Sequence, residues 1–296
     1  MNIMKKVRTL MKIIIMKGTF NNLNDESYLK LLYWTYMGKK LDLKNPERYT
    51  EKLQWQKLYD RKDTYTKMVD KYEAKCIVAS IIGNEHIIPT LGVWDSAKEI
   101  DFEDLPEKFV LKTTHDSGGV KIIDKAKGMN KEEIIEYFEK RKARNLYKLS
   151  REWPYKNVKP RIIAEQYMED EKTHELRDYK FFCFDGKVKA LFIATDRQSK
   201  NPTAFDFFDE NFNWLNIRNG HPNASTKPEK PQNFEVMKEL AAKLSKGFCQ
   251  IRVDLYEING KVYFGELTFF HHGGIVPFDP DEWDYTFGSW IELPNK

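Results

Sequence analysis

The stretch Arg252–Phe270, RVDLYEINGKVYFGELTFF, decides the fold that we expect for this chain. Two runs of alternating apolar and polar residues flank Asn259-Gly260, a dipeptide that favours a two-residue hairpin turn. The first run carries Asp254 and the second carries Glu266. Antiparallel pairing would bring both carboxylates onto the same part of a sheet. The stretch therefore predicts a β-hairpin that presents two acidic side chains together.

Two carboxylates on apolar strands repel each other unless a cation lies near them. Mg²⁺ is a natural partner, because it takes oxygen ligands and usually shares them with phosphates. We therefore interpret Asp254 and Glu266 as metal ligands. The alternative interpretation is that each carboxylate pairs with a neighbouring lysine or arginine.

Other strand patterns lie earlier in the chain. A second hairpin is expected around Asp185-Gly186, for the same reason as the first. Single strands are expected at residues 108–114, 120–124 and 161–168. Helical periodicity occupies roughly residues 1–80 and returns at 131–145 and 234–248. Residues 211–233, rich in Asn, Pro and Lys, are expected to form a long loop.

Helices followed by a small mixed sheet and then by hairpins indicate the α+β class. The regular strand–helix alternation of a doubly wound sheet is missing. We expect a helical N-terminal region at residues 1–84. A small subdomain with a glycine-rich loop at 85–160 and a large subdomain with the metal site at 161–296 would follow.

The glycine-rich loop is the sequence Ser117-Gly118-Gly119, which follows the strand that carries Lys112. Glycines let backbone N–H groups turn towards an anion, and a nearby lysine offers a point charge to a phosphate. The loop joins two strands, so it differs from the strand-to-helix loop of a P-loop protein. A plain turn would have the same sequence.

Three more charged residues lie on the hairpin around Asp185-Gly186. Asp178 and Lys180 alternate along one strand and share a face, and Arg197 lies near the end of the partner strand. The cations Lys180 and Arg197 would offset the negative charge of phosphoryl transfer. Surface ion pairs would explain them equally well.

Composition excludes few classes of protein. The 296 residues carry a net charge of +4 without a dense basic stripe, which argues against nucleic-acid binding. The cysteines Cys76, Cys183 and Cys249 are far apart and sit among apolar neighbours, so we expect buried, reduced thiols and a cytoplasmic protein.

The N-terminal segment MNIMKKVRTLMKIIIMKG has an apolar run that is too short to span a bilayer. We expect a helix packed on its own domain. The same helix is basic and amphipathic, so it would also suit peripheral contact with a membrane surface.

Together these segments resemble the ATP-grasp superfamily, and specifically its TupA-like branch, which is linked to teichuronopeptide and capsular polysaccharide biosynthesis. The resemblance covers roughly residues 45–295. The segments that carry it are NPERYTEKLQWQKLYD, FVLKTTHDSGG, AEQYM, RDYKFFCFDGKVKALFIATDR, RVDLYEINGKVYFGELTFF and GSWIELP.

The resemblance implies two α+β subdomains that grip ATP between them. It places Lys112 at the nucleotide phosphates, with the loop Ser117-Gly118-Gly119 closing over them. It also implies that Asp178 contacts the ribose. The linker that reads adenine would be formed by Glu165, Gln166, Tyr167 and Met168, with the first contact made by either Glu165 or Gln166.

The remaining assignments concern the reacting end of the nucleotide. Lys180 and Arg197 would act in catalysis, with Arg197 at the γ-phosphate or an acyl phosphate. Asp254 and Glu266 match the magnesium ligands, while Tyr256 would pack on adenine. Thr268 stands where the family often has Asn, so we expect its hydroxyl or a water molecule as the third ligand.

The activity implied is that of an ATP-dependent carboxylate–amine ligase, which uses Mg²⁺ and forms an amide through an acyl phosphate. The carboxylate would belong to a uronic acid of a cell-surface glycan and the amine to an amino acid, or the reverse. The expected place is the cytoplasm, at the inner face of the membrane if the N-terminal helix makes contact there. No nucleic acid is expected as a partner.

Two alternatives stay open at this stage. A glycosyltransferase using a nucleotide sugar would also need carboxylates and a metal, and Asp279-Pro280-Asp281 has the DxD spacing of that class. A non-catalytic glycan or nucleotide module is the other alternative, prompted by Thr268. His271 and His272 are expected either to contact substrate or to pack in a loop, since no third zinc ligand is in view.

Overall fold

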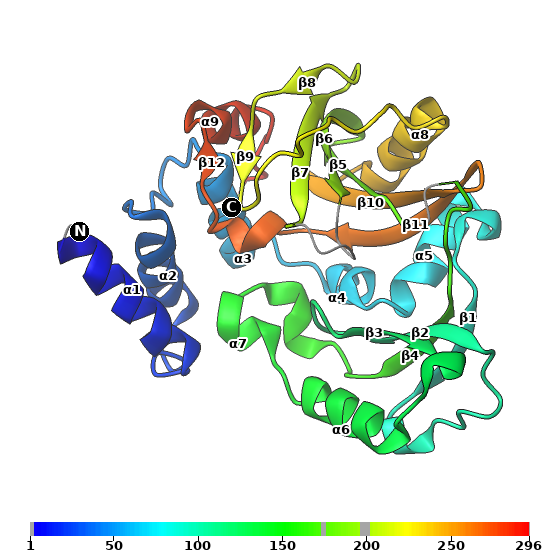
Figure 1. Ribbon diagram of the computed structural model, residues 1–296. Helices are drawn as coiled ribbons and strands as arrows, with labels where there is room; N and C mark the ends of the chain where they lie inside the picture. Colours follow the sequence, from blue (N-terminus) through cyan, green and yellow to red (C-terminus); the bar gives the residue numbers. More distant parts are fainter. Residues whose placement is uncertain (1–2, 173–175, 196–201, 296) are drawn as a thin grey trace.

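The computed structural model of the protein describes residues 3–172, 176–195 and 202–295. Helices and antiparallel sheets make up these residues, which confirms the predicted α+β class. Figure 1 shows a larger sheet with helix α8 above and a smaller sheet with helix α6 below, while α1 and α2 lie to one side.

The large sheet has the strand order β11-β10-β5-β6-β7-β8 among the described residues, and every neighbouring pair is antiparallel. Both predicted hairpins are confirmed, since β5 pairs with β6 and β10 pairs with β11. Each residue of β5 is buried, because this strand has neighbours on both sides and covered faces. The strands are β5 (Asp178–Phe184), β6 (Lys187–Thr195), β7 (Ala204–Asp209), β8 (Trp214–Leu215), β10 (Ile251–Ile258) and β11 (Lys261–Thr268).

The small sheet has the order β1-β4-β2-β3 among the described residues. Its strands are β1 (Thr90–Trp94), β2 (Lys108–Thr113), β3 (Val120–Asp124) and β4 (Ile162–Gln166). Strand β4 was assigned from sequence to the large subdomain, but it pairs with β1 and β2. The boundary between the sheets thus falls after Gln166 rather than at residue 160, because a strand pattern does not reveal which strand it will pair with.

The helical region consists of α1 (Ile3–Met16), α2 (Asp25–Met37), α3 (Tyr49–Tyr59), α4 (Asp63–Val69) and α5 (Glu73–Ile82). The helical periodicity predicted for roughly residues 1–80 gave no sign of the break between α4 and α5. At this break, the Asp70 side chain accepts hydrogen bonds from the backbone N–H groups of Tyr72 and Glu73, which caps the second helix.

The other helices are α6 (Lys131–Lys142), α7 (Leu146–Ser150), α8 (Phe234–Ser245) and α9 (Glu282–Ser289). The segment 211–233, expected to be a loop, contains the short strands β8 and β9 (Arg218–Asn219). Strand β9 pairs with β12 (Phe278–Asp279). Short 3₁₀ helices occur at Asn84–His86, Ala97–Glu99, Lys125–Lys127, Trp153–Asn157 and His271–Gly274.

All three cysteines are free. Cys183 is buried and Cys249 is half-buried, but Cys76 is exposed, so the expectation of burial is wrong for Cys76. Within residues 3–172, 176–195 and 202–295, no helix is long and apolar enough to cross a membrane.

Aromatic side chains fill the core between the large sheet and α9. Phe182 on β5 is 1% exposed, and its ring lies within 6.3 Å of the ring centroids of five neighbours. These neighbours are Tyr49, Phe192, Phe207, His271 and Phe287.

Replacing Phe182 with Ala should lower the free energy of unfolding by about 3–5 kcal/mol, because a large cavity would open among these rings. Denaturant titration followed by circular dichroism measures this loss. Val236→Ala is the matched control: Val236 is 42% exposed, and its loss should change stability by less than about 0.5 kcal/mol. Equal effects of the two substitutions would contradict this account of the core.

Candidate functional site

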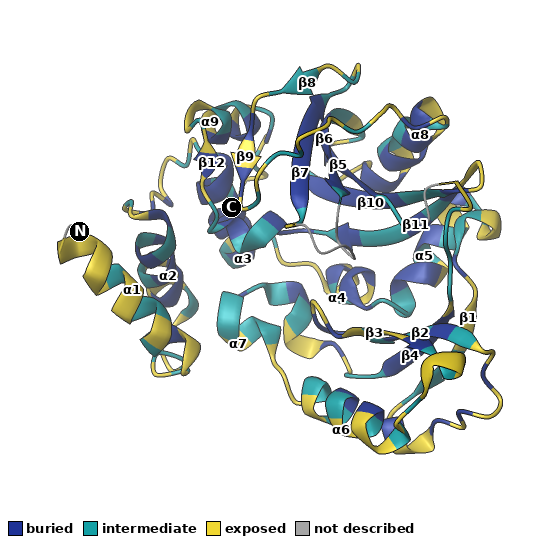
Figure 2. Ribbon diagram, viewed as in Figure 1, coloured by how far each residue is buried: buried dark blue, intermediate teal, exposed yellow. Residues whose placement is uncertain are grey.

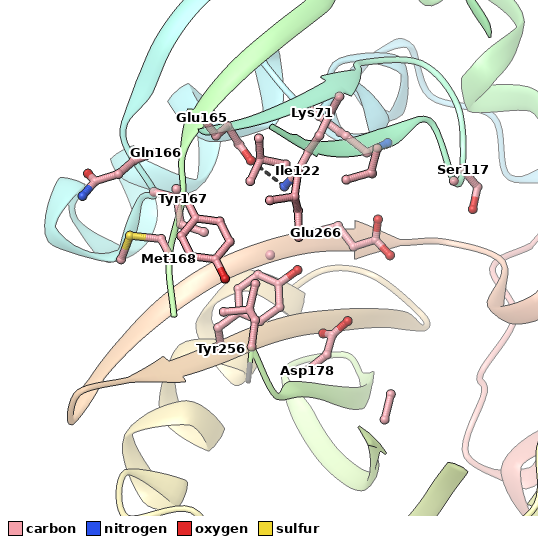
Figure 3. A pocket seen from close by; sticks show the side chains of 18 of the residues that line it. Lys71, Ser117, Ile122, Glu165, Gln166, Tyr167, Met168, Asp178, Tyr256 and Glu266 are labelled. Atoms are coloured by element: carbon pink, nitrogen blue, oxygen red, sulfur yellow. Dashed lines mark ion pairs between the residues drawn. The ribbon is translucent and has the colours of Figure 1, made fainter. Parts of the chain in front are cut away.

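A cavity of about 540 Å³ lies between the two sheets, with residues of both sheets in its walls (Figure 3). Most of the residues predicted from sequence contribute to these walls. They are Lys112, Ser117, Gly118, Glu165, Gln166, Tyr167, Met168, Asp178, Lys180, Tyr256 and Glu266. The structure therefore brings together side chains from distant parts of the chain.

Three predicted residues, Gly119, Asp254 and Thr268, are not among the residues that line the cavity. Arg197 falls outside the described residues. Each of the first three nonetheless contacts the wall residues or shapes the backbone next to them.

On the small sheet, Lys112 is fixed by an ion pair with Glu165. Their Nζ and Oε2 atoms are 2.5 Å apart, and Lys75 from α5 pairs with the other carboxylate oxygen. Burial of Glu165 would raise its pKa, but the ammonium groups of Lys112 and Lys75 outweigh burial and hold the pKa below its ordinary value. Glu165 is therefore ionised and holds both lysines beside the cavity.

The glycine-rich loop is anchored to α6. Arg141 donates a 2.5 Å hydrogen bond to the carbonyl of Ser117, and Tyr137 donates to the carbonyl of Gly118. Gly118 has φ = +80°, a conformation that favours glycine. A Cβ on Gly119 would lie only 2.0 Å from the Thr113 Oγ1 atom, so this position has no room for a side chain.

Lys71 is a cavity residue that the sequence analysis missed. It lies between α4 and α5, and its ammonium donates a 2.6 Å hydrogen bond to the carbonyl of Asp116 at the start of the glycine-rich loop. Burial lowers the pKa of Lys71. No local pattern marks this lysine, because neither a glycine turn nor a strand surrounds it.

On the large sheet, Asp254 and Glu266 occupy directly paired positions of β10 and β11. The Glu266 side chain is 44% exposed and lines the cavity. A bulge follows this pair, since Leu255 pairs with Phe264 and Gly265 is the extra residue. The predicted juxtaposition of the two acids is confirmed.

Asp254 is fully buried, and both of its oxygens are engaged. Arg252 contacts them with Nε at 2.7 Å and Nη2 at 2.8 Å, and Lys180 forms a further ion pair. Burial would raise the pKa of Asp254, but Arg252 and Lys180 outweigh it and lower the pKa to about 2. Lys180 also contacts Asp178 at 2.6 Å, so it lies between two carboxylates at the cavity wall.

Arg252 is a second residue that the sequence analysis did not select. Its guanidinium also donates 2.9 Å and 3.3 Å hydrogen bonds to Thr268 Oγ1 and Glu266 Oε1. The remaining guanidinium nitrogen, Nη1, lies 2.7 Å from His271 Nδ1. Because Arg252 and Asp254 alternate on one strand, their shared face was visible in the sequence.

His271 is buried between Arg252 and Asn219. Its Nε2 atom lies 2.8 Å from Asn219 Oδ1, whose amide nitrogen donates to the carbonyls of Val276 and Pro277. That network makes Nε2–H the donor and leaves Nδ1 to accept from Arg252. Burial lowers the pKa of His271 well below its ordinary value, so the ring is neutral. Substrate contact and loop packing were the two roles expected for His271, and the structure supports loop packing.

Part of the cavity wall is apolar and aromatic. In Figure 3, Tyr167 and Met168 lie on one side and Ser117 on the opposite side, with Glu266 and Asp178 directed between them. Ile88, Val110 and Ile122 complete the apolar wall. A flat base with a charged tail fits such a cavity, since its walls offer apolar and aromatic surfaces together with the ammonium groups of Lys71, Lys112 and Lys180.

The side chains at the cavity offer few ligands for a metal ion. Among the described residues, no group of three or more His, Cys, Asp and Glu side chains is placed to hold one. Mg²⁺ commonly needs only one or two carboxylates together with phosphate oxygens, and Glu266 can supply a carboxylate at the cavity wall. Asp254 and Thr268 are engaged by Arg252, so their roles as ligands stay predictions.

The DxD-like segment lies elsewhere. Asp279 belongs to β12, and Asp281 forms ion pairs with Lys39 and Arg48. Neither aspartate is among the residues that line the cavity. Nothing about their positions supports a nucleotide-sugar site.

Solved structures with similar folds include several ligases. The L-amino acid ligase from Bacillus licheniformis is 14% identical, with a TM-score of 0.46 over 85% of this chain and 57% of that protein. The D-alanine–D-alanine ligase from Bacillus anthracis complexed with ATP is 15% identical, with a TM-score of 0.40 over 68% of this chain and 53% of that protein. This chain thus spans little more than half the length of these two proteins.

The ATP-grasp ligase PsnB complexed with minimal precursor is 9% identical, with a TM-score of 0.40 over 70% of this chain and 54% of that protein. A search of the curated proteins found no match. Residues 51–292 match the family described as TupA-like ATPgrasp. Since this match covers both sheets and the whole cavity, the chain belongs to the TupA-like ATP-grasp family and has the ATP-grasp fold.

Proposed function

We propose that this protein is an ATP-dependent carboxylate–amine ligase. The observation that carries the proposal is the cavity between the two sheets, whose walls combine three lysines with apolar and aromatic side chains. Family membership supports the same activity, because the cavity lies in the part of the chain that matches.

ATP would supply a phosphoryl group to a substrate carboxylate, giving an acyl phosphate and ADP; an amine would then attack the acyl carbon, releasing phosphate and a proton and leaving an amide. Lys112 and Lys71 would hold the phosphates at the glycine-rich loop. Lys180 would stabilise charge that develops on the transferred group and on the acyl oxygen, while Arg252 would hold Asp254, the partner of Lys180, in place. Glu266 would hold Mg²⁺ against the phosphates.

The nucleotide would lie with its base near Gln166, Tyr167, Met168 and Tyr256 and its ribose near Asp178. Arg197 is proposed to contact the transferred phosphoryl group. Closure of the two sheets on the nucleotide would keep water from the acyl phosphate.

The substrate is proposed to be a uronic acid of a capsular or other cell-surface polysaccharide, with an amino acid as the amine. Resemblance to the TupA-like branch supports this choice. We propose that the reaction takes place in the cytoplasm, at the inner face of the membrane.

A screen of phosphate release tests the activity. Purified protein is incubated with ATP and Mg²⁺, each of the twenty amino acids, and candidate uronic-acid glycans. We expect release that requires both a carboxylate and an amine. ATP binding without phosphate release in any combination would favour a non-catalytic nucleotide module and contradict the proposal.

Replacing Lys112 with Met should weaken ATP binding about tenfold or more, because a charged hydrogen bond to phosphate contributes about 1.5–3 kcal/mol. Isothermal titration calorimetry with ATP and Mg²⁺ measures the change. Lys121→Met is the control: Lys121 lies on the neighbouring strand β3 and pairs with Glu133 outside the cavity. Unchanged affinity in the Lys112 variant would exclude the proposed phosphate contact.

Replacing Glu266 with Gln should reduce ATP turnover at least about a hundredfold, because the variant would lose the carboxylate that is proposed to hold Mg²⁺. The fold should stay intact, because the side chain is partly exposed and makes one long contact with Arg252. Turnover is measured at saturating ATP across a range of Mg²⁺ concentrations. Glu257→Gln on the same hairpin is the control, since Glu257 caps the turn before α8 and lies outside the cavity. Full turnover in the Glu266 variant would remove its assigned role.

Asp254→Asn should instead destabilise the fold by about 3–5 kcal/mol, because Arg252 and Lys180 would lose their buried counter-charge. The pKa of Asp254 falls from 3.8 to about 2 on folding, so its stabilising contribution is complete above about pH 4 and is lost as pH falls towards 2. Urea titrations of both proteins between pH 2 and 7 check this. Parallel pH profiles of the two proteins would contradict it.

A further inference from the structure

Helix α1 exposes an unusual amount of apolar surface. Ile3 is 77% exposed, Leu10 is 58% exposed and Met16 is 71% exposed. Met4, Val7 and Ile13 are also at least 41% exposed, whereas Ile15 is the buried residue of the helix. Figure 2 shows exposed surface along much of α1, which lies apart from the two sheets.

Four of the apolar residues form a face. At 3.6 residues per turn, the exposed Ile3, Val7 and Leu10 and the half-buried Ile14 fall within an arc of about 60°. The opposite part of the helix is attached to α2. Arg8 donates hydrogen bonds of 3.0 and 2.7 Å to the carbonyls of Thr35 and Tyr36, near the end of α2. The packing of α1 on α2 therefore directs this face outwards.

The charge around the face has one sign. Lys5, Lys6 and Lys17 are exposed, while Arg8 and Lys12 are half-buried. From Ile3 to Asn24 the sequence contains five basic residues and no acidic one. The first acid, Asp25, is itself paired with Arg61 at 2.7 Å and Arg151 at 3.2 Å.

The helix pair α1–α2 is fixed to the rest of the protein. Arg151 donates a 2.7 Å hydrogen bond to the carbonyl of Asn21 in the connection between the two helices. Tyr28 on α2 donates a 2.9 Å hydrogen bond to the carbonyl of Leu149 in α7. The apolar face is thus held at a defined angle to the body that contains the cavity.

We propose that the outer face of α1, formed by Ile3, Val7, Leu10 and Ile14, binds the surface of a membrane that contains anionic phospholipids. Apolar residues on one side of a helix enter the boundary of headgroups and acyl chains, while lysines pair with anionic headgroups. A second copy of the chain is a poorer occupant, because pairing two α1 faces would bring two sets of basic residues together without acidic partners. The proposal does not depend on the ligase activity.

Co-sedimentation with vesicles tests the proposal. The full-length protein, tagged at its carboxyl end, is mixed with vesicles of phosphatidylcholine containing phosphatidylglycerol, or with vesicles of phosphatidylcholine alone. We expect binding to the anionic vesicles that weakens as salt is raised. Absence of binding to the anionic vesicles would overturn the proposal.

The double variant Val7→Asp/Leu10→Asp should reduce binding to anionic vesicles about tenfold or more, because two charges would enter the apolar face. Val236→Asp/Ile81→Asp is the matched control, since Val236 and Ile81 are 42% and 45% exposed on α8 and α5. The control should bind as the wild type does. Equal loss in both variants would overturn the assignment to α1.

A milder pair of substitutions guards against loss of structure. Lys5→Gln/Lys6→Gln keeps the apolar face and should bind anionic vesicles several-fold less tightly. Circular dichroism and melting temperature verify that each variant is folded. Light scattering without lipid detects self-association. The proposal would be refuted if the wild type were a dimer that did not bind vesicles and Val7→Asp/Leu10→Asp converted it to a monomer. That result would assign the face to a second copy of the chain.

Discussion

Ion pairing between buried groups of opposite charge organises the cleft of this protein. On the large sheet, Asp254 lies between Arg252 and Lys180, and both of its oxygens are used. On the small sheet, Glu165 lies between Lys75 and Lys112. An unpaired charge in either position would be costly, so these pairs fix Lys112 and Lys180, the two cations among them that line the cavity.

Each pair is supported by a further layer of contacts. Arg252 contacts neutral His271, whose other nitrogen is held by Asn219. The glycine-rich loop is held by Arg141 and by Lys71. Contacts within the protein thereby hold these cationic groups in place, which is the preorganisation that the proposed stabilisation of developing charge would require.

Local signals in the sequence predicted the local structure well. Asn259-Gly260 and Asp185-Gly186 each mark a hairpin because few other dipeptides adopt the turn that they need. Hairpin pairing then placed Asp254 opposite Glu266 correctly. Lys71 and Lys75 could not be found in this way, because they come from the helical region, and only tertiary packing brings Lys71 to the cavity and Lys75 to Glu165. The sheet to which β4 belongs was missed for a similar reason, since pairing depends on partners that are distant in sequence.

The carboxylates that pair with the cavity lysines also affect the release of a bound nucleotide. Lys112 and Lys180 each have a carboxylate partner within the protein itself. A departing polyanion would therefore leave no cluster of uncompensated positive charge behind it. If the cavity binds ATP as proposed, repulsion between the two sheets would therefore not be the force that opens the cleft for product to leave.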